Sequence, residues 1–118
     1  MKNYLVIGGS RGIGKAIVEQ LPDHAEIHVI SRTGYKGDKT NVVNHLLDVT
    51  IDSLPELENI HHLIYCPGSI QLKPINSLKI EDFQSDFDIN VLGAVKAIKQ
   101  YHRTLKRQKG SILLFSTV

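Results

Sequence analysis

The sequence predicts an α/β fold: a Rossmann-like, doubly wound parallel sheet with strand order 3-2-1-4-5. Short apolar runs alternate with helical or loop segments along the whole chain. The runs are nearly continuous in hydrophobicity, which is typical of parallel strands buried on both faces. A glycine-rich turn over residues 8–14 joins the first run to the first helical segment. Right-handed crossovers then give this strand order and place a ligand site at the switch point between strands 1 and 4.

Length and composition fit one soluble domain over residues 1–118, with 42% hydrophobic and 22% charged residues. The net charge of +2 is too small to indicate a nucleic-acid partner. The single cysteine, Cys66, excludes an internal disulfide, and the adjacent His61 and His62 would point to opposite faces of a strand, so no metal site is expected. With no membrane-length apolar run and no signal peptide, we expect a cytoplasmic protein without a membrane partner.

The first half of the chain contains three strands and one helix. A strand over residues 1–8 leads through the glycine turn into a helix over 12–21. A second strand covers residues 26–31 and a third covers 42–47. The intervening residues 32–41 are polar and glycine-rich without a helical period, which predicts a loop with at most one helical turn.

The second half is dominated by one long helix. Pro55 allows only a short helix before the fourth strand, and Ser77 is the predicted cap of the helix after it. The predicted elements are a short helix, a strand, a loop, a helix start, the long helix and a last strand, over residues 51–59, 61–66, 69–76, 77–82, 84–107 and 111–115. Apolar residues of the long helix recur at helical spacing, at Phe87, Val91, Val95, Ile98 and Leu105.

The glycine turn has the composition of a phosphate site. Glycines at 8, 12 and 14 would let an anion approach the bare backbone, and the helix that follows offers free N–H groups and the positive end of its dipole. The alternative is a glycine-rich turn that binds nothing. Residues 9–15 also fit the P-loop pattern G-x-x-x-x-G-K, but Ala16 stands where a P-loop needs Ser or Thr to hold magnesium.

The spacing Gly8-x-x-x-Gly12-x-Gly14 resembles the T-G-x-x-x-G-I-G turn of the short-chain dehydrogenase/reductase family, with Ile7 in place of the threonine. The resemblance extends over the whole chain but covers only the first part of that family's domain, which would be truncated after strand 5. It implies an NAD(P)-binding Rossmann fold and cofactor contacts from the turn, at Gly8, Ser10, Arg11, Gly12, Ile13 and Gly14.

Two later motifs match the family in part. The resemblance makes Asp48 and Val49, directly after strand 3, the pair that meets the adenine; the alternative is a helix-capping aspartate. The family motif N-N-A-G falls on residues 65–68, where only the glycine is retained. The backbone of Pro67 and Gly68 could still line the ribose, without the family's side-chain hydrogen bonds.

The resemblance also implies catalytic positions. Residues 87–93 match F-x-x-N-x-x-G, which assigns Asn90 to a proton relay; a plain buried hydrogen bond is the alternative. Thr117 falls where the family has a serine that binds the substrate carbonyl, or Ser116 if the register is one residue off. The family's Tyr-x-x-x-Lys pair lies after strand 5, and the sequence stops at Val118, so we expect no catalysis by this chain alone.

The residues after strand 2 favour NADP over NAD. NAD sites place an acidic residue there for the ribose 2′-hydroxyl, whereas this strand ends Ser31-Arg32. Arg11 in the glycine turn is a second guanidinium suited to a 2′-phosphate. The alternative for Arg32 is a solvated loop charge.

Three functions therefore remain open. The first is the nucleotide-binding part of an NADP-dependent oxidoreductase that transfers hydride to or from a carbonyl or alcohol substrate. The second is a non-catalytic NADP-binding or sensor module, and the third is an interaction domain that has lost its ligand. A fifth strand at an uncovered sheet edge, together with the long helix, predicts a homo-oligomer.

Overall fold

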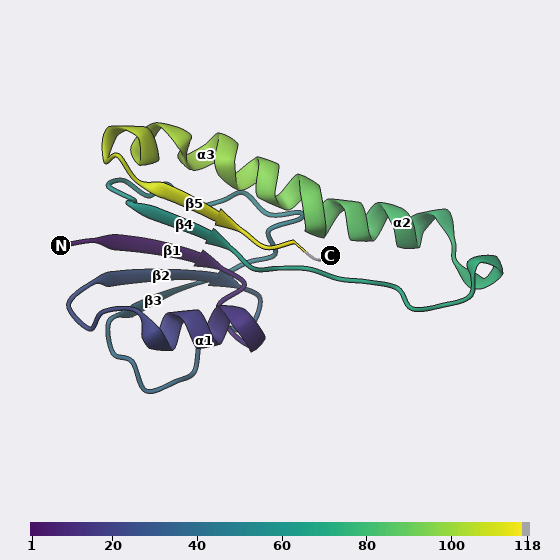
Figure 1. Ribbon diagram of the computed structural model, residues 1–118, viewed down its shortest axis with the longest axis horizontal. Coiled ribbons are helices and arrows are strands. Elements are labelled where there is room, and N and C mark those ends of the chain that lie inside the picture. The colour runs from purple at the N-terminus through teal and green to yellow at the C-terminus, as the bar shows by residue number, and fades with distance from the viewer. Residues whose placement is uncertain (117–118) are drawn as a thin grey trace.

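The computed structural model describes residues 1–116 and has the predicted fold class. Five parallel strands form one sheet in the order β3-β2-β1-β4-β5 (Figure 1). The strands are β1 (Asn3–Ile7), β2 (Glu26–Ser31), β3 (Val42–Leu46), β4 (His62–Tyr65) and β5 (Ser111–Leu114). The helices are α1 (Gly12–Gln20), α2 (Ile80–Phe87) and α3 (Gly93–Arg107), with a 3₁₀ turn at Ile75–Ser77 and a π-turn at Asp88–Leu92.

Strand β1 is the centre of the sheet and pairs with β2 on one side and β4 on the other. Leu5 lies opposite His28 in β2 and Leu63 in β4. The chain leaves β1 toward α1 and leaves β4 toward the long helix, so the two helices cover opposite faces (Figure 1). The ends of β1 and β4 therefore diverge at the switch point that the sequence predicted.

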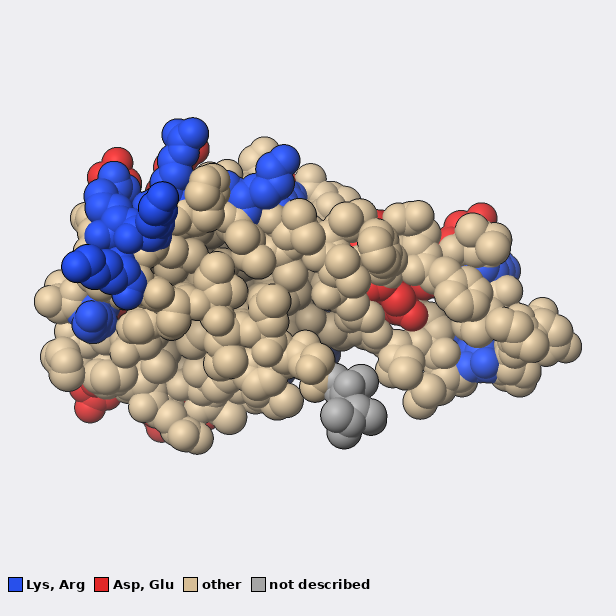
Figure 2. Space-filling view, turned by 45° about the horizontal axis from the view of Figure 1, so that its top comes forward, with Lys and Arg blue, Asp and Glu red and all other residues tan. Residues whose placement is uncertain are grey.

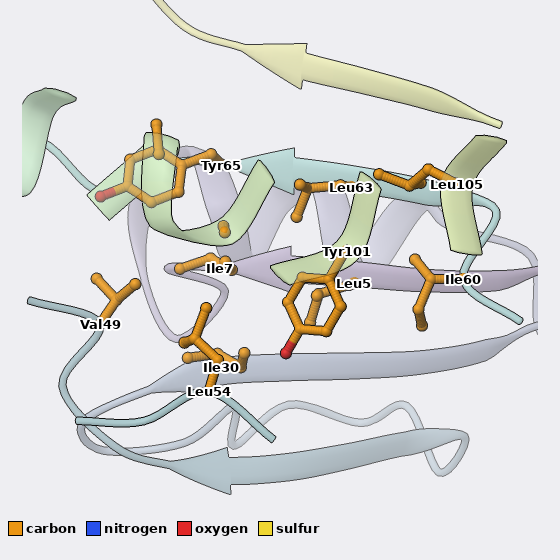
Figure 3. Close-up of a cluster of buried hydrophobic side chains, with 12 residues drawn as sticks. Leu5, Ile7, Ile30, Val49, Leu54, Ile60, Leu63, Tyr65, Tyr101 and Leu105 are labelled. Atoms are coloured by element: carbon orange, nitrogen blue, oxygen red, sulfur yellow. The ribbon is translucent and has the colours of Figure 1, made fainter. Parts of the chain in front are cut away.

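Each face of the sheet has its own apolar core. The core on the α3 face is built around Leu5, Ile7, Leu63 and Tyr101, each at most 1% exposed (Figure 3). The core on the α1 face contains, among others, Val6, Val18, Ile27, Val29, Tyr35 and Ile64. Alternation along β1 sends neighbouring side chains into different cores, which explains why the strand reads as continuously apolar.

The predicted short helix over residues 51–59 is wrong, because this segment is an extended loop. Two of its carbonyl groups, and that of Val49 just before it, accept hydrogen bonds from side chains of α3 and not from the backbone of a helix. Lys96 Nζ donates to the carbonyls of Val49, at 3.1 Å, and Asp52, while the Tyr101 hydroxyl donates to that of Pro55 at 2.7 Å. These long-range partners satisfy the backbone groups that a helix would otherwise pair.

The long helix begins at Ile80, so the predicted cap at Ser77 is also wrong. Ser77 lies in the 3₁₀ turn, and Lys79 is the cap residue, its amide donating to Asp82 Oδ2 at 3.0 Å. The buried face of α3 is formed by small residues and two larger ones: Gly93, Ala94, Ala97, Tyr101, Thr104 and Leu105. Of the five apolar positions singled out in the sequence, only Leu105 is buried, because the small residues bring the helix close to the sheet.

Apolar side chains also lie on the outside of the molecule. Ile112, Leu113 and Leu114 of β5 are each 42–51% exposed at the sheet edge, which is where the sequence predicted self-association. Phe87, Val91 and Val95 are half exposed along the long helix. Among the described residues, none of the helices combines the length and hydrophobicity that a membrane crossing requires.

Candidate functional site

A pocket of about 280 Å³ lies at the carboxyl ends of β1, β2, β3 and β4, beside the start of α1. All of the residues expected to contact a cofactor line it: Gly8, Ser10, Arg11, Gly12, Ile13, Gly14, Ser31, Arg32, Asp48, Val49, Pro67 and Gly68. The topology explains this convergence, because the loops after four parallel strands meet at one edge of the sheet. The lining also includes residues that sequence reasoning passed over: Ile7, Ile30, Leu47, Cys66 and Ile89.

The glycine turn brings backbone to the pocket wall in a conformation that larger residues disfavour. Gly8 and Gly12 have φ of +85° and +59°. A methyl group on Gly14 would overlap the Gly8 carbonyl, and one on Gly8 would lie 3.0 Å from Pro67. The Gly8 amide donates to the Ile30 carbonyl at 2.8 Å, which fixes the turn against β2.

The first turn of α1 is open to an anion. Arg11 occupies the N-cap position without making a side-chain cap, and the first turn contains no acidic residue. The free amides and the positive end of the helix dipole are therefore not neutralised by a neighbouring side chain of that turn. This arrangement, together with the bare glycine backbone, suits a phosphate or diphosphate group.

Asp48 is held in place by its own turn. Its Oδ1 accepts hydrogen bonds from the amide and the hydroxyl of Thr50, at 2.9 and 2.6 Å, and its amide donates to Asp52 Oδ2 at 2.7 Å. These bonds from Thr50, and then the charges of Arg32 and Lys96, lower the pKa of Asp48. The group is an ionised acceptor at neutral pH, and because no helix follows it, it does not cap one.

The end of β2 carries a hydroxyl and a cation and no carboxylate. Ser31 is 9% exposed and its Oγ accepts from the Gly34 amide at 2.9 Å, which leaves its own proton free for another acceptor. Arg32 is exposed at the rim, and Arg11 is exposed on the glycine turn. Two guanidinium groups thus lie on the lining of one pocket that also contains the open end of a helix.

Cys66 lies in the pocket lining but is not a reactive thiolate. Burial raises the pKa of its thiol to about 11, so it stays protonated at neutral pH. Cys66 follows β4 directly and precedes Pro67. This position at the end of a strand is the sequence feature that could have predicted its place in the pocket lining.

Asn90 is exposed, so it does not make the buried hydrogen bond that was the alternative to a relay, and it fastens the segment that follows β4. Its Oδ1 accepts from the Ser69 amide and its Nδ2 donates to the Ser69 carbonyl, both at 2.9 Å. The Ser69 hydroxyl donates to Asp86 Oδ1 at 2.5 Å. The neighbouring Ile89, and not Asn90, contributes to the pocket lining. Thr117 lies outside the described residues, and Ser116 is exposed.

The spacing Tyr-x-x-x-Lys also occurs earlier in the chain, at Tyr35 and Lys39. Tyr35 is 5% exposed in the core on the α1 face, and its hydroxyl accepts from the Lys39 amide at 3.4 Å. Lys39 Nζ pairs with Asp23 at 2.6 Å. Neither residue lines the pocket, so this pair is structural.

Within residues 1–116, no group of three or more His, Cys, Asp or Glu side chains could hold a metal ion. His61 Nδ1 accepts from the Asn3 amide at 3.1 Å, whereas His62 Nδ1 lies 2.7 Å from the Ser111 hydroxyl. The two histidines therefore have separate partners.

Comparisons with known proteins agree with the fold. No family model matches the chain. It is 26% identical to the uncharacterized oxidoreductase C30D10.05c of Schizosaccharomyces pombe, over 98% of this chain and 53% of that protein. The chain thus spans about half the length of the curated relatives it matches.

Solved structures share the fold over nearly the whole chain. The short-chain dehydrogenase/reductase YIR035C from Saccharomyces cerevisiae is 25% identical, with a TM-score of 0.84 over 99% of this chain and 54% of that one. An alcohol dehydrogenase from Thermococcus sibiricus complexed with 5-hydroxy-NADP has a TM-score of 0.79 at 23% identity, covering 97% of this chain and 57% of that one. A short-chain dehydrogenase from Leptospira borgpetersenii with bound NAD⁺ has a TM-score of 0.83 at 23% identity, covering 98% and 51%. The sheet order, the glycine turn and these similarities identify the chain as short-chain dehydrogenase/reductase-like over about half the length of the proteins it matches.

Proposed function

We propose that this chain binds NADP(H) in the pocket at the carboxyl end of the sheet, as the nucleotide-binding part of an NADP-dependent oxidoreductase. The observation that carries the proposal is the convergence of the glycine turn, the open helix end, two arginines and Asp48 on one pocket. The similarity to oxidoreductases of about twice this length supports the reaction class. The substrate would be a small carbonyl or alcohol compound.

The residues present fit a dinucleotide. The uncapped start of α1 suits the diphosphate because it offers free amides without a competing carboxylate, and the glycine turn at 8–14 leaves bare backbone beside it. Asp48 is ionised and can accept a hydrogen bond from an adenine amine, and Val49, which is 6% exposed, adds an apolar contact. Pro67 and Gly68 would place backbone against the ribose.

The choice of NADP over NAD is supported by charge at the end of β2. A 2′-phosphate would meet the Ser31 hydroxyl and the guanidinium groups of Arg32 and Arg11, and would meet no carboxylate at the end of that strand. Among the similar structures, the Thermococcus sibiricus dehydrogenase is complexed with an NADP derivative and the Leptospira borgpetersenii enzyme with NAD⁺. Both support a nicotinamide cofactor, and Arg11 and Arg32 support NADP.

When bound, the nicotinamide would supply the hydride chemistry. This chain's own residues would bind and orient the dinucleotide and exclude water from its apolar side. Asn90 would hold the segment after β4 through its bonds to Ser69, and its main-chain carbonyl lies in the π-turn, where a relay water could be held. Thr117 is proposed to bind the substrate carbonyl.

A non-catalytic NADP-binding module is the second candidate. Tyr65, Cys66 and Pro67 replace the side chains of the family's N-N-A-G motif. In addition, Tyr35 lies in the core, and neither Tyr35 nor Lys39 lines the pocket. This candidate shares NADP binding with the first. The two differ for a chain extended by any coding sequence that follows Val118: the first predicts turnover of NADPH with a panel of aldehydes and ketones, and the second predicts none.

The test is a calorimetric titration of the chain with NADPH and with NADH. We expect NADPH to bind at least about tenfold more tightly, and Arg32→Ala to remove that preference by deleting a charge-assisted contact. Arg103→Ala is the matched control, since Arg103 is an exposed cation on α3 and does not line the pocket. Equal binding of the two dinucleotides by the wild-type chain would contradict the NADP assignment, and binding of neither would contradict the function.

A further inference from the structure

A buried tyrosine contacts the π-turn that interrupts the long helix beside the pocket. Tyr65 ends β4, is 4% exposed, and its hydroxyl donates to the carbonyl of Ile89 within the π-turn Asp88–Leu92. A π-turn alters the regular helical pairing and leaves carbonyl groups available for other donors. The Tyr65 hydroxyl supplies such a donor from a different element, across the interface between the sheet and the helix (Figure 3).

The helix is shaped to receive this hydroxyl. Gly93 follows the π-turn, and a methyl group on it would overlap the Tyr65 oxygen. Burial, and then the charge of Asp48, raises the pKa of Tyr65 to about 12, so the hydroxyl keeps its proton and remains a donor at neutral pH. Tyr65 and Gly93 are therefore complementary in shape, and the hydrogen bond between Tyr65 and Ile89 persists over the working pH range.

The held carbonyl belongs to a residue of the pocket wall. Ile89 is part of the lining, and the next residue, Asn90, makes both of its side-chain amide hydrogen bonds to the backbone of Ser69. Rotation of the π-turn would displace Ile89 from the pocket and separate Asn90 from Ser69. One hydroxyl on β4 thus constrains two neighbouring residues that act on the pocket from the helix side.

We propose that Tyr65 is a positioning residue, whose hydroxyl occupies the space left by Gly93 and holds the π-turn so that Ile89 lines the pocket and Asn90 fastens Ser69. The consequence for ligand binding rests on the proposed NADP site; the positioning itself does not. Tyr65 stands at the first of the four positions of the family motif N-N-A-G, of which only the glycine is retained. A tyrosine at this position connects β4 directly to the π-turn of the long helix.

Selective isotope labelling tests the positioning without any ligand. Isoleucine followed by asparagine occurs at Ile75–Asn76 and Ile89–Asn90, so a chain labelled with ¹³C′-Ile and ¹⁵N-Asn gives two correlated amide signals. We expect Tyr65→Phe to shift the Asn90 signal and leave that of Asn76 unchanged. Tyr101→Phe is the matched control, because its buried hydroxyl donates to Pro55, outside the π-turn, and it should shift neither signal. An unchanged Asn90 signal in Tyr65→Phe overturns the proposal.

A double-variant cycle tests the shape complementarity. Gly93→Ala should lower the Tm by about 5–10 °C, because the methyl group meets the Tyr65 oxygen. Adding Tyr65→Phe removes that oxygen, so the double variant should melt at a higher temperature than Gly93→Ala alone. If the two losses in Tm simply add, Tyr65 and Gly93 are not coupled and the proposal is overturned.

Dinucleotide affinity then measures the consequence for the pocket. Tyr65→Phe should raise the Kd for NADPH about fivefold, the loss of one hydrogen bond, while Tyr4→Phe, near the amino end of β1 and outside the pocket lining, leaves it unchanged. If the wild-type chain binds no NADPH, the proposed function fails, and the Asn90 signal and the Tm cycle still decide the positioning role. If NADPH binds and Tyr65→Phe leaves the Kd unchanged, the π-turn does not set the pocket and the proposal is overturned in that respect.

Discussion

The two ends of the sheet carry positive charge in different ways. At the end of α3, exposed cations gather, and no Asp or Glu follows residue 88 in the sequence (Figure 2). These cations are Lys99, Arg103, Lys106, Arg107 and Lys109. At the carboxyl end of the strands, the only lining cations of the described pocket are Arg11 and Arg32, but they accompany bare glycine backbone and an uncapped helix start.

The difference teaches that backbone geometry, and not the number of cations, makes the candidate site. The end with more charge is closed: Gly110 packs against the His61 carbonyl, and the Ile60 amide donates to Thr104 Oγ1 at 3.0 Å. Basic side chains there also complement the negative end of the α3 dipole, which is a sufficient reason for them. The less charged end has left-handed glycines, an open pocket and unpaired helical amides.

The largest effect is expected from two glycines, one at each end. Alanine at Gly14 or at Gly110 places a methyl group on a carbonyl, of Gly8 or of His61, so both variants should lose about 2–3 kcal/mol of stability. Only Gly14→Ala should also weaken NADPH binding, by about tenfold or more. Thermal melts measure the loss of stability in the two variants, and calorimetry measures their affinity for NADPH. An equal loss of affinity in Gly110→Ala would contradict the proposal that the two ends of the sheet differ in ligand binding.

A smaller effect is expected at Lys96, which lies one helical turn before Lys99. The Lys96 amine bonds to the carbonyls of Val49 and Asp52 and so holds the loop that lines the pocket, whereas Lys99 is exposed. Lys96→Met should raise the Kd for NADPH about fivefold by releasing this loop. Lys99→Met should leave the Kd unchanged, and a similar rise in both variants would show that charge alone acts on the ligand.

The pH dependence of stability distinguishes the loop at the pocket from the rest of the chain. Hydrogen bonds from Thr50 lower the pKa of Asp48 in the folded state below its ordinary value of 3.8. The group therefore contributes stability above that value, and the contribution is lost as pH falls through the lower folded pKa. Melts between pH 5 and pH 2 should show a shallower loss in Asp48→Asn, by less than about 1 kcal/mol because the group is partly exposed. Parallel curves would contradict the bond to Thr50.

The smallest effect is expected at the basic end of α3. Replacing Arg103 and Lys106 together by Gln should change the Kd for NADPH less than about twofold at 0.15 M salt, because both lie at the far end of the sheet and are screened. Calorimetry at low and moderate salt checks this result. A loss of NADPH affinity comparable with that of Arg32→Ala would place the ligand at the basic end of α3 and contradict the proposed site.

The fold could be predicted from the sequence because its signals are local and redundant. The glycine turn, the continuous apolar strands and the long helical period each indicate a parallel α/β sheet, and the observed order is the predicted one. The extended conformation of the segment 51–59 could not be predicted from the sequence. Its carbonyls accept hydrogen bonds from Lys96 and Tyr101, which lie more than 40 residues away. The N-cap at Lys79 could not be predicted either. Serine has the higher N-cap propensity, but Ser77 lies in a 3₁₀ turn before the helix.

The residues of the candidate site that directly follow a strand could be predicted from the sequence. The residues that reach it through the packing of the long helix on the sheet could not. Residues after β1, β3 and β4 were named from the resemblance to the short-chain dehydrogenase/reductase family, and those after β2 from the lack of an acidic residue there. They meet in the structure because parallel strands end at one edge. Ile89 and Tyr65 were missed because they reach the site from the helix and from the core. Asn90 was named for a proton relay, and the structure shows its side chain bonded to Ser69 and absent from the lining.

The most direct test of the NADP site is amide chemical-shift mapping of the ¹⁵N-labelled chain during titration with NADP⁺. We expect the signals that move to be those of the pocket end, including Gly8, Gly12, Val49 and Gly68, while those near Lys106 stay unchanged. Shifts gathered at the basic end of α3, with the glycine turn unmoved, would contradict the proposal that backbone geometry at the carboxyl end of the sheet makes the binding site.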